Sequence, residues 1–112
     1  MTPAARLSAA IDVLGDIETR RRPAPDALKD WGLSHRFAGS SDRAAIAGLV
    51  YDALRRKASA GFVMGEATPR AVALGMLRLE RGLDPDAIAR LADGARYAPA
   101  PLTTAERHAL EA

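Results

Sequence analysis

The sequence predicts an all-α fold, a bundle of five to six helices, and three observations support this prediction. Alanine and leucine dominate the 112 residues while aromatic residues contribute only 4%, a composition that favours helix over strand. Apolar residues recur at intervals of three and four, as they do along one face of a helix. Proline follows threonine or aspartate at the start of several of these segments, which is the signal of an N-cap and a first helical residue.

The first two predicted helices cover residues 3–20 and about 25–32. In the first, apolar residues follow one another at helical spacing from Leu7 to Ile17, and arginines suit its C-terminal end. In the second, Leu28 and Trp31 lie on one face. We therefore expect Trp31 to be a core residue rather than a stacking partner for a base.

The third predicted helix, about 42–57, has the clearest amphipathic pattern in the chain. It follows a loop at residues 35–41, and either Ser40 or Ser41 is expected to cap it. Its charged residues largely avoid the apolar stripe, which consists of Ala45, Ile46, Leu49, Val50, Ala53 and Leu54.

Residues 58–66 are weakly patterned and predict no more than a short helical turn. The helix that begins at Pro69, by contrast, is apolar on almost all sides as far as Leu79, so we expect it in the middle of the bundle. Gly75 within it costs about 1 kcal/mol relative to alanine. Close contact with a neighbouring helix would account for that glycine.

Two more helices are predicted near the end of the chain, one from Asp84 and one from Thr103. The second has a capping box, because Glu106 stands three residues after Thr103. A Pro-Ala-Pro segment precedes it. We expect residues 1–95 to form the domain and residues 96–112 to be a linker and the start of a helix that leads to a further domain.

Charge and residue usage exclude several classes of function. The net charge is +2, but residues 1–60 hold ten Lys/Arg and seven Asp/Glu, a balance of +3 that permits a polyanionic partner. The absence of cysteine excludes disulfides, thiolate metal sites and cysteine nucleophiles. No phosphate loop or metalloprotease motif is present, and we assign no catalytic residue and no metal ligand. Without a signal peptide or an apolar membrane-spanning segment, we expect a cytoplasmic protein.

The candidate site is the basic stretch around the third predicted helix. Glycine, serine backbone groups and a helix N-terminus attract phosphate, and arginines supply charge. The alternative is that the cations merely complement the C-terminal end of the helix. Because the five aromatic residues are scattered along the sequence, we expect no base-stacking platform. The candidate RNA-binding residues are Arg36, Gly39, Ser40, Ser41, Arg43, Arg55, Arg56 and Lys57.

The amino-acid sequence of this stretch resembles that of the NusB-like domain at the N-terminus of bacterial ribosomal-RNA cytosine-C5 methyltransferases of the Sun/Fmu type. The matching segments extend from the loop to the proline-rich linker. They are His35-Arg36-Phe37-Ala38-Gly39, Ser40-Ser41-Asp42-Arg43, Leu49-Val50-Tyr51, Leu54-Arg55-Arg56, Thr68-Pro69-Arg70, Leu77-Arg78-Leu79 and Ala98-Pro99-Ala100-Pro101-Leu102.

The resemblance implies a helical module that positions ribosomal RNA for a methyltransferase domain of its own chain. That family's catalytic domain binds S-adenosylmethionine and uses a cysteine nucleophile. This sequence has no cysteine and no segment that would bind S-adenosylmethionine, so we expect no cofactor in this chain. Two alternatives stay open. One is a protein-docking domain, and the other is a free-standing antitermination-like factor.

Overall fold

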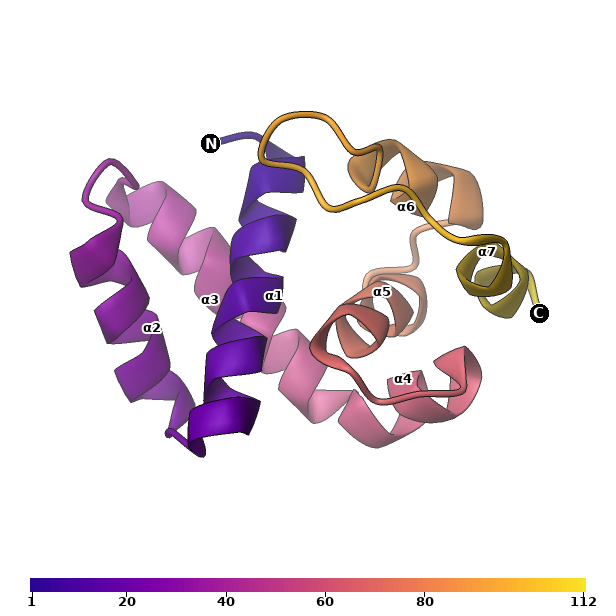
Figure 1. Ribbon diagram of the computed structural model, residues 1–112, viewed down its shortest axis with the longest axis horizontal. Helices are drawn as coiled ribbons and strands as arrows, with labels where there is room; N and C mark the ends of the chain where they lie inside the picture. Colours follow the sequence, from indigo (N-terminus) through magenta and orange to yellow (C-terminus); the bar gives the residue numbers. More distant parts are fainter.

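The computed structural model describes all 112 residues. It contains seven helices and no strand, which confirms the all-α prediction. Figure 1 shows α1, α2 and α3 on one side of the molecule and α4 to α7 on the other. The helices are α1 (Pro3–Arg20), α2 (Ala24–Ser34), α3 (Ser40–Arg55), α4 (Lys57–Met64), α5 (Pro69–Leu79), α6 (Pro85–Leu91) and α7 (Thr104–Glu111).

Two helices organise the core. α1 packs against α2, α3, α5 and α6, and it buries an apolar face that includes Leu7 and Val13. α5 contributes an unbroken buried run from Ala71 to Leu77, as expected for a helix in the middle of a bundle. The side chains of Ile46, Leu74 and Ile88 are fully buried in the same core, which joins α3, α5 and α6.

The helix count differs from the expected five to six because residues 57–64 form a complete helix, α4. Their local pattern is weak, but Ala60 is fully buried and faces Gly75 of α5. A Cβ added to Gly75 would lie 2.7 Å from the Cβ of Ala60, so only glycine fits there. Tertiary packing thus stabilises a helix that local propensity does not predict.

Side-chain caps occur at most of the predicted helix starts but not at α3. Thr2, Thr68 and Asp84 each accept a hydrogen bond from a backbone N–H in the first turn, and Thr103 with Glu106 forms the complete capping box. At α3 the N-cap is Gly39, with no side-chain cap. The expectation that Ser40 or Ser41 caps this helix was wrong, because both residues already lie inside its first turn.

The last helix packs onto the body of the protein. Leu110 is fully buried in the main core cluster. Arg70 of α5 also binds Glu106 through Nε–Oε2 (2.8 Å) and Nη2–Oε1 (3.0 Å), and the same side chain donates to the carbonyl oxygens of Ala100 and Pro101. Residues 96–112 therefore fold back on the helices before them, and the further domain stays a prediction. No helix combines the length and the apolar character needed to cross a membrane.

Candidate functional site

The predicted site residues form two groups at opposite ends of α3. The N-terminal group is Arg36, Gly39, Ser40, Ser41 and Arg43, and the C-terminal group is Arg55, Arg56 and Lys57. A helix rises about 1.5 Å per residue, so α3 separates the two groups by roughly 20 Å. The fold does not join them into one patch.

The N-terminal group carries two arginines without carboxylate partners. Arg36 and Arg43 are both exposed, and neither takes part in any of the ion pairs of the chain. The aliphatic part of Arg43 lies against α2, where a Cβ on Gly32 would be 3.2 Å from its Cδ. Gly39, Ser40 and Ser41 are exposed beside them, and no side chain satisfies the first N–H groups of α3.

The carboxylate nearest to this group is already neutralised within the protein. Asp42 lies in the first turn of α3, and its Oδ1 is 2.8 Å from Nη2 of Arg6 and 3.4 Å from the amino group of Met1. The hydrogen bond from Arg6 holds the pKa of Asp42 below its ordinary value. The charge left for an outside partner at this end of α3 is therefore that of Arg36 and Arg43.

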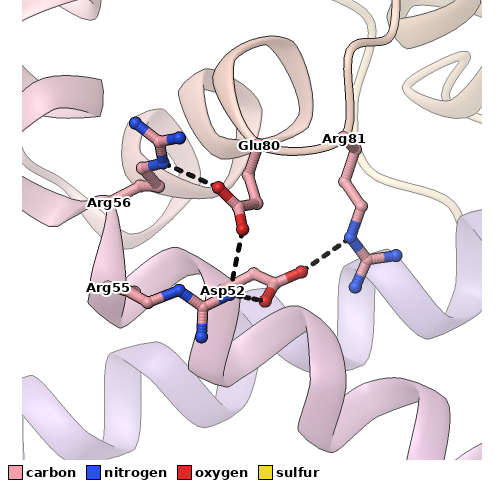
Figure 2. Close-up of polar contacts among 5 residues, drawn as sticks. All are labelled: Asp52, Arg55, Arg56, Glu80 and Arg81. Atoms are coloured by element: carbon pink, nitrogen blue, oxygen red, sulfur yellow. Dashed lines mark hydrogen bonds and ion pairs between the residues drawn. The ribbon is translucent and has the colours of Figure 1, made fainter.

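The C-terminal group has a different environment, because Arg55 and Arg56 are engaged in an ion-pair network. Figure 2 shows Asp52 and Glu80 each held by two guanidinium groups. Glu80 accepts from Arg55 (3.0 Å) and from Arg56 (2.8 Å), while Asp52 accepts from Arg81 (2.7 Å) and from Arg55. The network ties the end of α3 to the end of α5.

The network also affects protonation. Hydrogen bonds from Arg56 and Arg55 lower the pKa of Glu80. Partial burial raises the pKa of Asp52, but the hydrogen bonds and charges of Arg81 and Arg55 outweigh that effect and lower it. Both carboxylates thus stay ionised at neutral pH. To bind a phosphate, Arg55 and Arg56 would have to give up their ion pairs with these carboxylates. Lys57 is exposed and forms no ion pair.

Close to the N-terminal group lies a cleft that was not predicted from the sequence. It has a volume of about 640 Å³, and residues from α1, the end of α2 and the segment after α6 line it. We call it the aromatic cleft, because its walls include Trp31, His35, Phe37 and Tyr97. The five aromatic residues are scattered along the sequence, but the fold brings three of them to this cleft.

The rings of the aromatic cleft are held in a defined arrangement. Trp31 and His35 stack with centroids 4.2 Å apart and planes at 6°, and Phe37 meets His35 edge-on at 5.9 Å. His35 Nδ1 lies 2.8 Å from the carbonyl oxygen of Trp31 and donates to it, because a carbonyl only accepts. Trp31 also packs against the core, as expected. His35 is thus a structural residue of the cleft.

The opposite wall comes from the segment after α6. Tyr97 has φ +69°, a left-handed conformation that is uncommon for a bulky residue, and Arg96 lies 4.9 Å from the centre of its ring. Hydrogen bonds within this segment, from Gly94 N–H to Pro99 and from Ala98 N–H to Ala95, hold its backbone. No pattern in the sequence predicts this wall, because Tyr97 and Phe37 line the same cleft only in the folded chain.

Comparisons with known proteins add no identification. No family model matches the chain, and no curated protein sequence or solved structure matches it. The resemblance to the NusB-like domain therefore stays a prediction from the sequence.

Proposed function

We propose that this protein is an RNA-binding module whose phosphate-contacting surface is the N-terminal group at α3. The observation that carries the proposal is the pair of exposed arginines, Arg36 and Arg43, that have no carboxylate partner and flank a helix N-terminus that no side chain caps. Unpaired guanidinium groups bind phosphate without first giving up an internal ion pair. The N-terminal end of a helix adds a favourable dipole.

The resemblance described above supports the choice of RNA. On that basis we propose that the partner is ribosomal RNA, and that the module positions it for a cytosine-C5 methyltransferase domain that uses S-adenosylmethionine. We assign phosphate contact first to Arg36 and Arg43. Arg55 and Arg56 are secondary, because both are already paired with carboxylates of the chain.

A titration with a ribosomal-RNA fragment at low and moderate salt tests this function. Each phosphate contact should contribute a slope of about −0.7 to a plot of log affinity against log salt on single-stranded RNA. Arg36→Glu and Arg43→Glu should each weaken binding and reduce that slope. The control is Arg90→Glu on α6, which makes the same charge change at an exposed arginine without an ion-pair partner.

Two results would overturn the proposal. One is the absence of RNA binding even at low salt. The other is an equal loss of affinity in Arg43→Glu and Arg90→Glu, because the loss would then reflect the net charge of the protein and not the position of Arg43. Binding to a protein partner that hardly responds to salt would then favour the docking-domain alternative.

A further inference from the structure

The aromatic cleft lies next to the surface proposed to contact phosphate. Arg36 stands between His35 and Phe37, both of which line the cleft, and Arg96 lines it from the other side. An RNA strand bound by Arg36 would therefore lie close to the residues that line the cleft. This adjacency raises the question of what the cleft holds.

Its exposed rings are unusual for the surface of a small soluble domain. Phe37 is 73% exposed and Tyr97 is 68% exposed. His35, which stacks on Trp31, meets the ring of Phe37 edge-on, and the backbone at Tyr97 is left-handed. Backbone strain of this kind persists where the surrounding structure enforces it, and it concentrates at functional sites.

The polar groups of the cleft suit a flat heteroaromatic ring with polar edges. Asp12 and Ser8 line the cleft and offer hydrogen-bond partners to the N–H groups of a base. Partial desolvation raises the pKa of the carboxyl group of Asp12, an otherwise exposed residue, while the nearby charge of His35 opposes that shift. Two exposed cations could meet the phosphates that flank a base: Arg96, which lines the cleft, and Arg36, which lies between the lining residues His35 and Phe37 in the chain.

From this arrangement we propose that the aromatic cleft receives an unpaired base of single-stranded RNA, which stacks on Phe37 and Tyr97 while its flanking phosphates contact Arg36 and Arg96. The volume of about 640 Å³ lies within the range of roughly 300–1,000 Å³ that is usual for small-ligand sites. The inference rests on the proposed function, since it needs an RNA strand at Arg36, and it adds recognition of a base to that function.

The test compares two oligomers that differ only in their bases. One is a single-stranded RNA of about ten nucleotides, and the other is an abasic oligomer with the same number of phosphates. Trp31 is the only tryptophan of the chain and lines the cleft, so its fluorescence reports directly on occupancy. We expect the RNA to bind more tightly than the abasic oligomer and to change the fluorescence of Trp31, while the abasic oligomer leaves the fluorescence unchanged.

Phe37→Leu is the variant for the cleft, and Phe62→Leu is its matched control. Phe62 lies on α4 outside the cleft and is 89% exposed, so both substitutions remove an exposed ring and should leave the fold intact. Phe37→Leu should weaken binding of the RNA about 5- to 150-fold, the range expected for one base stacked on a ring. Its salt slope should stay that of the unmodified protein, because no phosphate contact is lost.

The outcomes separate this inference from the proposed function. Equal, salt-sensitive binding of the two oligomers would overturn the base site and leave phosphate binding intact. The absence of binding by either oligomer would overturn both proposals. Equal effects of Phe37→Leu and Phe62→Leu on RNA affinity would also overturn the base site. So would binding of both oligomers without any change in the fluorescence of Trp31. In either case an apolar side chain of a protein partner would be the better occupant of the cleft.

Discussion

Gly75 of α5 packs on Ala60 of α4 so closely that a Cβ on Gly75 would lie 2.7 Å from the Cβ of Ala60 and 2.9 Å from its Cα. Neither atom belongs to a flexible side-chain end, so the two helices have to move apart to admit a methyl group. Ala60 and Gly75 are both buried. This contact therefore sets the distance between α4 and α5.

The first prediction follows from this contact. Gly75→Ala should destabilise the protein by up to roughly 2 kcal/mol, because an overpacking penalty of about 1–3 kcal/mol is offset by only about 1 kcal/mol of helix propensity. The control is Gly15→Ala on α1, where nothing lies within 4 Å of an added Cβ. That substitution should stabilise by about 0.5–1 kcal/mol. Urea unfolding measures both, and a stabilising effect of Gly75→Ala would show that α4 moves freely on α5.

The second prediction concerns the two groups at the ends of α3. Arg55→Glu combined with Arg56→Glu should lower the melting temperature, because it places new carboxylates beside Asp52 and Glu80. The deficit should shrink at high salt, which screens repulsion between exposed charges.

The matched control for this second prediction is the pair Arg36→Glu and Arg43→Glu. These arginines have no ion-pair partner, so the change in stability should stay within about 0.5 kcal/mol. Thermal unfolding followed by circular dichroism compares the two double variants. Equal melting temperatures would mean that the network in Figure 2 contributes nothing to stability.

The third prediction concerns acid. The hydrogen bond from Arg70 lowers the pKa of Glu106 in the folded protein from the ordinary value of 4.5. A group whose pKa is lowered by folding contributes stability above its unfolded pKa, and this contribution is lost as the pH falls through the folded value. Glu106→Gln should therefore reduce the dependence of unfolding free energy on pH below about 4.5. Denaturant titrations at several pH values measure this dependence, and an unchanged profile would contradict the role of the pair.

The fourth prediction asks whether α7 belongs to the cooperative fold. Leu110 is fully buried, so Leu110→Ala should cost about 2–5 kcal/mol. Leu33→Ala is the control, because Leu33 is 55% exposed at the end of α2, and it should cost about 0.5 kcal/mol or less. A single unfolding transition shifted only by Leu110→Ala is the expected result. Similar small effects of both would place α7 outside the cooperative unit.

Local signals in the sequence predict much of this fold. The helix from Pro3 to Arg20 follows the expected bounds, and Thr68 and Thr103 cap their helices as predicted, because an N-cap involves only residues three apart. The helix at residues 57–64 was missed for the opposite reason. Its stability depends on Ala60 meeting Gly75, and contacts between distant segments leave no periodic pattern.

The same distinction applies to the candidate site. The basic stretch is visible in the sequence, but its division into two groups depends on partners far along the chain, since Glu80 lies 25 residues after Arg55 and 24 after Arg56. The aromatic cleft is harder to predict, because Trp31 and Tyr97 line the same cleft only when the segment after α6 returns to α1. The sequence shows which side chains are charged, but only the fold shows which of them have no ion-pair partner within the protein.

The position of the first residue has a practical consequence for handling the protein. Met1 lines the aromatic cleft, and its amino group lies 3.4 Å from Asp42. An affinity tag, a dye or a surface linkage attached there would stand at the mouth of the cleft and would remove a charge from the end of α3. The other terminus follows α7 and lies well away from the first residue in Figure 1. Immobilisation and labelling through the C-terminal end should leave the cleft open to any ligand under study.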